Sequence, residues 1–179
     1  MIKPAYQPSR FTSFLLLALA FIVTEAKALP EDRELPIQVK AQSMQWNNQQ
    51  QQATYQGEVE VHQGELVIEA ASLKILRSSA TGELKQAVAT TPQGQAYMRD
   101  LPDPVKPEVE AWGEVINYLP SQDLVILTGK ARLVQGTDSF TGHKLTYNLI
   151  TQDIQAEHKS ASDSRVEVIL TPAPKGADK

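Results

Sequence analysis

Tyr55-Gln56-Gly57-Glu58-Val59-Glu60-Val61-His62-Gln63-Gly64 has a counterpart 72 residues later, Leu127-Thr128-Gly129-Lys130-Ala131-Arg132-Leu133-Val134-Gln135-Gly136. Both copies have two glycines at the same places and a Gln before the second. Without any gap, the apolar residues stay in phase on both sides of this motif, with Met44 over Ile116, Trp46 over Tyr118, Ile68 over Phe140, Leu73 over Leu145 and Ile75 over Tyr147. Such self-similarity indicates stacked supersecondary units that share one core.

Alternation of apolar and polar residues predicts that each unit is built of strands with one buried face. We expect Val59, Val61, Ala131 and Leu133 to point inward, and Glu58, Glu60, His62, Lys130 and Arg132 to point outward. Both glycines of each motif are interpreted as turns between strands. The predicted strands are Ile37–Gln42, Met44–Trp46, Ala53–Tyr55, Glu58–Gln63, Leu66–Ala70, Leu73–Leu76, Leu84–Ala89, Gln95–Arg99, Val109–Tyr118, Leu124–Thr128, Ala131–Gln135, Ser139–Gly142, Lys144–Asn148, Asp153–Glu157 and Arg165–Thr171. The sequence therefore predicts an all-β sandwich or jelly roll.

The N-terminus has the features of a secretory signal peptide. A basic start is followed by an apolar stretch of 13 residues, Phe11 to Val23, and by Ala26-Lys27-Ala28, which fits an A-x-A cleavage site. We predict a cleavable signal peptide at residues 1–28, one domain at 29–171 and a disordered tail at 172–179. An uncleaved inner-membrane anchor is the alternative, although this stretch is shorter than the ~20 residues of a spanning helix.

Composition excludes several classes of function. The formal net charge is −4, and it becomes −6 after removal of residues 1–28, which argues against nucleic-acid binding. The chain has no cysteine, and its histidines at 62, 143 and 158 follow no metal-ligand spacing. Neither a nucleophile elbow nor a phosphate-binding glycine loop is present. We therefore predict no enzymatic activity, no metal and no cofactor.

Two segments interrupt the alternating pattern. Residues 47–52 are polar and of low complexity, and are expected to form a solvated loop. Residues 101–107 hold three prolines between the two units, and are expected to form a stiff connector.

The candidate binding residues are large side chains on inward positions of the predicted strands. Each one alone is typical of an ordinary β core. As a set they include several aromatics with a polar edge, which suit the wall of a partly wet cavity. We expect these residues to line an apolar groove: Ile37, Val39, Met44, Trp46, Tyr97, Trp112, Ile116, Tyr118, Phe140 and Tyr147.

The ordered motifs resemble those of the LptA/OstA family of periplasmic lipopolysaccharide-transport proteins. The resemblance rests on residues 36–39 (Pro-Ile-Gln-Val), 57–64, 125–135 and 142–147, and it runs over nearly all of the chain after residue 28. The sequence departs from the family in its proline-rich connector and in Lys130, where the family often has Asn.

The resemblance implies a twisted β-jelly roll, open at both ends, that binds the lipid A part of lipopolysaccharide in the periplasm. It also implies head-to-tail association with further copies, an inner-membrane transport component of the same fold at one end, and an outer-membrane lipopolysaccharide translocon at the other. The terminal strands fit this, because unprotected sheet edges pair readily with other chains. The edge residues we expect to take part are Ile37, Val39, Val166, Val168 and Leu170. Competing hypotheses are an inner-membrane-anchored relative, a periplasmic jelly-roll carbohydrate-binding module and a hydrolase.

Overall fold

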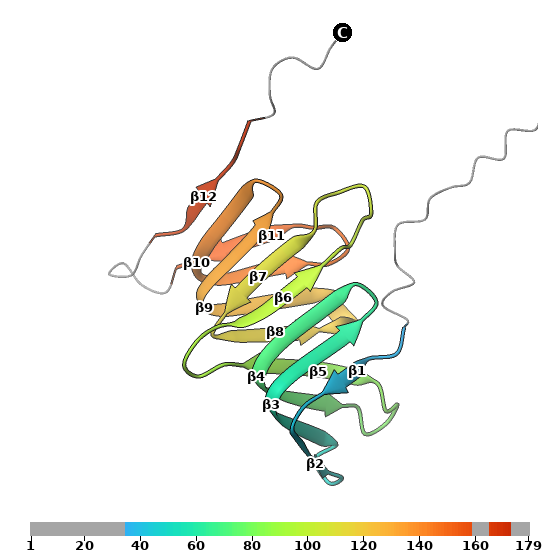
Figure 1. Ribbon diagram of the computed structural model, residues 1–179. Coiled ribbons are helices and arrows are strands. Elements are labelled where there is room, and N and C mark those ends of the chain that lie inside the picture. The colour runs from blue at the N-terminus through green and yellow to red at the C-terminus, as the bar shows by residue number, and fades with distance from the viewer. Residues whose placement is uncertain (1–34, 159–164, 173–179) are drawn as a thin grey trace, which may run out of the picture.

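The computed structural model describes residues 35–158 and 165–172, which fold into twelve strands and one 3-10 turn (Figure 1). All strand pairs are antiparallel, as expected for a jelly roll. The elements are β1 (Gln38–Lys40), β2 (Ser43–Asn47), β3 (Gln52–Gln63), β4 (Leu66–Arg77), β5 (Leu84–Thr90), β6 (Ala96–Asp100), β7 (Val109–Gly113), β8 (Val115–Leu119), η2 (Pro120–Gln122), β9 (Leu124–Gln135), β10 (Asp138–Asn148), β11 (Ile154–Glu157) and β12 (Glu167–Ile169). The predicted signal peptide at 1–28 and residues 173–179 of the predicted tail lie outside the described residues.

Two layers of strands face each other, and the four long strands β3, β4, β9 and β10 pass from one layer to the other. The first layer has the order β2-β3-β4-β5-β8-β9-β10-β11, and the second has the order β1-β3-β4-β6-β7-β9-β10-β12. Hydrogen-bonded pairing therefore closes a ring, β4-β5-β8-β9-β7-β6, around the middle of the molecule. β1 and β2 lie at one end of the stack and β11 and β12 at the other (Figure 1).

The first glycine of each motif lies in a bulge rather than in a turn. Gly57 and Glu58 have φ of 80° and 47°, and the register of β3 shifts there. Gly129 and Lys130 repeat this geometry with φ of 78° and 48°. The bulge lets one long strand bend from the first layer into the second, as bulges commonly do. The prediction of a turn was wrong at this position, and it is correct for the second glycines, Gly64 and Gly136, which lie in hairpins.

The 72-residue repeat is present in three dimensions. β2 and β3 cover the residues equivalent to β8 and β9 without any shift. The contact at the bulge is also repeated: the Gln42 amide donates to the Gly57 carbonyl at 3.0 Å, and the Glu114 amide donates to the Gly129 carbonyl at 3.0 Å. The fold is thus two copies of one unit, stacked side by side and sharing one interior.

Several predicted strands have different limits in the structure. Pairs of short predicted strands merge into β3, β4, β9 and β10, because the bulges do not end the pairing. The predicted strand Val109–Tyr118 is two strands, since the chain changes layer at Glu114. The predicted C-terminal strand is reduced to β12.

Burial confirms which side of the motif strands faces the interior. Val59, Val61, Ala131 and Leu133 are buried, and the alternate residues of β3 and β9 are exposed or half-exposed. The core follows the interior from β3 to β10, and its largest fully buried side chains include Tyr147, Met98, Ile116, Leu127 and Leu133. Burial of apolar surface on this scale is what holds together a fold without disulfides.

Candidate functional site

A cavity lined largely by apolar side chains lies at the N-terminal end, between the two layers. Its volume is about 510 Å³. β1 contributes Val39, β2 contributes Met44 and Trp46, and Ile37 precedes β1. The other lining residues are Leu35, Ala53, Tyr55, Gln63, Ile75, Arg77, Gly82 and Leu84. Most of the lining side chains are apolar, and Gln63 and Arg77 add polar groups to the wall. A concave site of this kind suits a ligand with an apolar part.

The rim of this N-terminal cavity is exposed at two large side chains, Met44 at 59% and Trp46 at 40%. Their repeat equivalents, Ile116 and Tyr118, are buried to 0% and 4% exposure. The two strands differ in their pairing, because β8 lies between β5 and β9 in its layer, whereas β2 pairs only with β3 among the described residues. At the mouth of the cavity, β2 therefore exposes the apolar side chains that its repeat equivalent, β8, buries.

A polar group lies at the inner end of the N-terminal cavity. Gln63, at the end of β3, is buried, and its Nε2 donates a hydrogen bond to the Leu35 carbonyl at 3.2 Å. The Tyr118 hydroxyl, which reaches across from β8, donates to Gln63 Oε1 at 3.3 Å. Burial of a polar group without a hydrogen-bond partner would destabilise the fold, and these hydrogen bonds provide such partners.

A second, much smaller cavity continues inward from the first. The two share the lining residues Ile37, Gln63, Ile75 and Leu84, and Tyr118 lies in the wall of the inner one. The inner cavity has a volume of about 10 Å³, at the lower limit for a single water molecule. The apolar path is therefore wide at the N-terminal mouth and almost closed at Tyr118.

The ten predicted groove residues occupy five different places. Ile37, Val39, Met44 and Trp46 line the N-terminal cavity. Tyr118 borders the inner cavity, and Ile116 and Tyr147 are fully buried in the core. Phe140 is half-buried and packs against the core near the C-terminal end. Tyr97 and Trp112 are the two for which the predicted inward orientation was wrong.

Tyr97 and Trp112 lie on the outer face of the second layer. In β6 and β7 the buried positions include Ala96, Met98 and Ala111, and the aromatic side chains alternate with them. The two rings contact each other with centroids 5.5 Å apart and planes tilted by 44°. They are therefore too far from the interior to line the cavity.

The surroundings of this aromatic pair are polar. The Arg132 guanidinium lies over the Trp112 ring, 5.2 Å from its centroid, which is the geometry of a cation–π interaction. The Tyr97 hydroxyl donates to Glu110 at 2.8 Å. Desolvation, together with the hydrogen bond to the Glu110 carboxylate, raises the pKa of Tyr97 to about 12.

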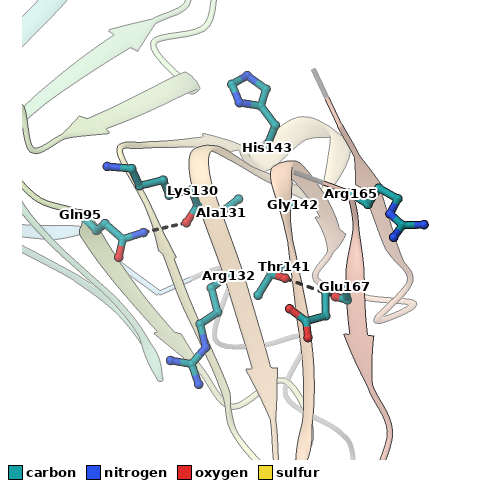
Figure 2. A pocket seen from close by; sticks show the side chains of 9 residues that line it. All are labelled: Gln95, Lys130, Ala131, Arg132, Thr141, Gly142, His143, Arg165 and Glu167. Carbon is teal, nitrogen blue, oxygen red and sulfur yellow. Dashed lines mark hydrogen bonds between the residues drawn. The ribbon is translucent and has the colours of Figure 1, made fainter. Parts of the chain in front are cut away.

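A charged cleft of about 410 Å³ lies on the same outer face, toward the C-terminal end. Its charged side chains are Lys130, Arg132, Arg165 and Glu167, with His143 beside them. Figure 2 shows Lys130 and Arg165 on opposite sides of the cleft with their charged ends directed apart. The cations do not converge on one point, so this cleft does not have the form of a site for a single anion.

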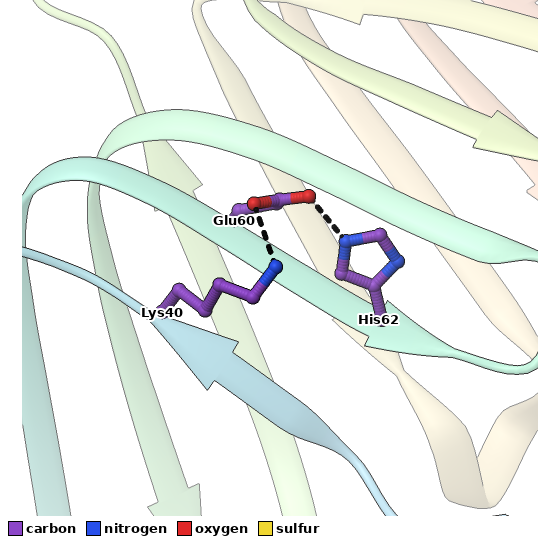
Figure 3. Close-up of polar contacts among 3 residues, drawn as sticks. All are labelled: Lys40, Glu60 and His62. Carbon is purple, nitrogen blue, oxygen red and sulfur yellow. Dashed lines mark hydrogen bonds and ion pairs between the residues drawn. The ribbon is translucent and has the colours of Figure 1, made fainter.

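A third polar cluster joins β1 to β3 on the outer face near the N-terminal mouth (Figure 3). The Glu60 carboxylate accepts hydrogen bonds from His62 at 2.5 Å and from Lys40 at 3.4 Å. These two partners, with His62 the stronger, hold the pKa of Glu60 below its ordinary value of 4.5. The cluster helps to fix β1, one wall of the cavity, in place.

Several cavity residues were missing from the sequence prediction. Tyr55 and Ile75 align with the inward residues Leu127 and Tyr147, so the repeat contained the signal for them. Gln63 belongs to the repeat, but a hydropathy pattern does not predict it as a wall residue, because glutamine is polar whether it is buried or exposed. Leu35 and Leu84 had no comparable signal.

Residues 35–158 and 165–172 contain no group of three or more side chains that could together bind a metal ion. No helix in this part of the chain is long and apolar enough to cross a membrane.

Comparison with known proteins agrees with this arrangement. The profile of the LptA/(LptD N-terminal domain) LPS transport protein family matches residues 38–153. The chain belongs to this family. It is 31% identical over 155 residues to lipopolysaccharide export system protein LptH of Pseudomonas aeruginosa, which covers 84% of this chain and 87% of that protein. It is 28% identical over 170 residues to LptA of Escherichia coli K12, covering 94% and 89% of the two chains.

Solved structures give the same result for the fold. The crystal structure of LptH from Pseudomonas aeruginosa is superimposable with a TM-score of 0.72 at 28% identity, and it covers 80% of this chain and 100% of that one. That protein is described as the periplasmic component of the lipopolysaccharide transport device. The all-β jelly-roll fold and the role in lipopolysaccharide transport are therefore confirmed.

Proposed function

We propose that this protein is a periplasmic, non-enzymatic bridge component that carries the acyl chains of lipid A in its N-terminal cavity. The observation that carries the proposal is a cavity of about 510 Å³, lined largely by apolar side chains, at one end of the jelly roll. It occurs in a chain that belongs to a family of lipopolysaccharide-transport proteins. The proposal includes export by the signal peptide at 1–28, one folded domain at 29–171, and delivery from an inner-membrane component of the same fold to an outer-membrane translocon.

The energetic reason for such a carrier is the exposure of acyl chains to water. Each methylene exposed to water costs about 0.8 kcal/mol, so a chain of about a dozen carbons costs roughly 10 kcal/mol. An apolar cavity removes most of this barrier without any chemical step. Binding at one position need only be strong enough to hold the chain until it moves on.

Fluorescence quenching tests where the acyl chain binds, because the chain has only two tryptophans. The Trp112→Phe variant leaves Trp46 in the cavity wall, and the Trp46→Phe variant leaves Trp112 on the outer face. A lipopolysaccharide or fatty acid with brominated acyl chains is expected to quench Trp46 and to leave Trp112 unaffected. Equal quenching of both, or of Trp112 alone, would contradict binding in the cavity.

We propose further that copies associate head to tail through their end strands. Within the described residues, β1 and β2 pair only with β3, and β11 and β12 pair only with β10, so each end presents free strand edges. An end-to-end contact between two different edges is heterologous and leads to an open chain of copies. Pairing of strands between chains uses the free backbone groups of both edges.

The repeat predicts the register of this pairing. Along the chain β7 is equivalent to β1, which makes Ala111 the equivalent of Val39. β12 lies on β10 in the register that β6 has on β4, which makes Val168 the equivalent of Met98. Since Met98 pairs with Ala111 inside the chain, we expect Val168 to pair with Val39 of the next copy.

The same argument applies to the other layer. β11 lies on β10 as β5 lies on β4, and β2 is equivalent to β8. Since Ala89 pairs with Ile116 inside the chain, Ala156 is expected to pair with Met44 of the next copy, and Ile154 with its Trp46. The exposed rim of the cavity would then be covered as the corresponding surface of β8 is covered here.

Carbohydrate binding on the outer face is a second candidate, favoured by the outward position of Tyr97 and Trp112. Aromatic faces beside polar groups suit sugar rings, although Arg132 already covers the ring of Trp112. The Trp46→Phe variant tests this as well. A change in Trp112 fluorescence on addition of the delipidated oligosaccharide would support it, and no change would exclude it.

A further inference from the structure

The path from the N-terminal cavity into the middle of the molecule is closed at one contact. Tyr118 belongs to the first layer and Gln63, at this end of β3, to the second. Their hydrogen bond therefore crosses the interior from one layer to the other. On the outer side of the contact lies the cavity of about 510 Å³, and at the contact itself the free volume is about 10 Å³.

Beyond this contact the interior is filled by side chains. Ile116, Leu127 and Tyr147 are all fully buried in the C-terminal half of the core. An acyl chain that enters at the N-terminal mouth thus has room as far as Tyr118, and inward side chains must rearrange for it to go further. The Tyr118 ring is the first of these that must move.

The contact is of a kind that can open. The separation of 3.3 Å is long for a hydrogen bond from a hydroxyl to an oxygen, whose usual value is about 2.7–2.8 Å. Gln63 is also tied to the chain entry, because its Nε2 donates to the Leu35 carbonyl. Gln63 therefore connects the mouth of the cavity to the closure at Tyr118.

We propose that Tyr118 and Gln63 form a gate that limits how far an acyl chain enters and that must open for the chain to pass. The inference rests on the proposed function and assigns to these two residues the control of chain length in the cavity. Neither residue carries out chemistry. Tyr118 is the obstacle and Gln63 holds it in position.

The repeat extends the gate to the junction between copies. Gln135 is equivalent to Gln63, and Trp46 is equivalent to Tyr118. In the head-to-tail register derived above, the indole of Trp46 from the next copy comes to lie across the interior from Gln135. An indole N–H is a hydrogen-bond donor like a tyrosine hydroxyl, so each junction would repeat the same closure.

A chain-length series tests the gate. Straight-chain saturated fatty acids of increasing length are titrated into the full-length mature protein, and affinity is measured by calorimetry. In the unaltered protein we expect affinity to rise about fourfold per methylene and then to stop rising at the length that reaches Tyr118. In Tyr118→Leu the limit is expected to move to longer chains. The matched control is Tyr147→Leu, the same change at a buried tyrosine that lines neither cavity, and it should keep the original limit.

The Gln63→Leu variant provides a test that does not depend on loss of a large buried ring. Leucine is similar in size to glutamine but cannot accept the hydrogen bond from the Tyr118 hydroxyl. The chain length at which affinity stops rising should therefore again move to longer fatty acids. A limit at the same length in Tyr118→Leu and Gln63→Leu as in the unaltered protein would overturn the gate and leave the proposed function intact. Failure of the unaltered protein to bind any of the fatty acids would overturn the proposed function and the gate together.

Discussion

Replacement of Val168 and Leu170 by serine tests the proposed junction between copies. Both side chains lie at the C-terminal edge, with exposures of 46% and 65%. Phe140, which pairs with Val168, points inward, and Leu170 has the same orientation two residues further on. Their equivalents inside the chain, Met98 and Asp100, are almost completely buried. The junction should therefore bury what is now exposed on both side chains.

The magnitude follows from these exposed fractions. Full burial of a valine or leucine side chain stabilises by about 1.5–3 kcal/mol, and the two exposed parts together amount to roughly one side chain. The double variant should weaken association by about 2 to 3 kcal/mol, which is roughly a 30- to 150-fold increase in the dissociation constant. Folding of the single copy should change little, since these residues are exposed in it.

Sedimentation velocity over a range of concentrations measures this change. The control is Ile169→Ser on the same strand, where the exposed fraction is 54% but the side chain points outward. We expect less than about a threefold effect from it, because a one-residue shift along a strand exchanges the two faces. A larger loss for Ile169→Ser than for the double variant would refute the derived register, and unaltered association in both would refute pairing through this edge.

Three further predictions concern the bulge and the outer face. Gly129→Ala should lower the free energy of unfolding by about 1 kcal/mol or more in chemical denaturation, because φ is 78° and an added Cβ would overlap the side chain of Glu114. Lys130→Asn should raise the free energy of unfolding by a few tenths of a kcal/mol, since Asn accepts the φ of 48° more readily. Tyr97 has a raised pKa of about 12, so its contribution to stability is complete below pH 10 and is lost as pH rises toward 12. Ultraviolet titration of Tyr97→Phe should show one tyrosine ionisation near pH 12 fewer than in the unaltered protein. Glu60 has a lowered pKa, so its contribution is present above 4.5 and is lost as pH falls through the folded-state pKa, and carbon-detected NMR titration should show that pKa rise in His62→Ala.

The sequence was sufficient for the class of fold, because the repeat and the alternation report the same physical fact twice. Val59 and Val61 face the interior for the same reason as Ala131 and Leu133, and the apolar residues of β4 and β10 stay in phase with each other. The position of the bulge was not predictable from the glycine alone. A glycine with positive φ fits a turn or a bulge equally well, and the choice depends on whether pairing continues on the neighbouring strand.

Tyr97 and Trp112 were misplaced although their neighbours held the correct phase. In β6 the alternate residues Ala96 and Met98 are apolar, and Arg99 shares the parity of Tyr97. The size and apolar area of an aromatic ring outweighed this alternation in the prediction. An aromatic on the outer face of a strand is stabilised by its neighbours, here by ring contact and by Arg132, which only the sheet register brings together.

Whether an inward residue lines a void or fills a core cannot be deduced from alternation, because both environments select apolar side chains. The structure separates them by pairing: within residues 35–158 and 165–172, β2 has one strand partner where β8 has two, and the same face is open in one unit and filled in the other. Inside the six-strand ring many inward side chains are small, including Ala87, Ala89, Ala96, Ala111 and Ala131. A few large side chains, above all Tyr118, therefore account for the closure. Because rotation of side chains costs far less than separation of paired strands, an interior that is filled at rest is compatible with passage of an acyl chain without opening of the ring.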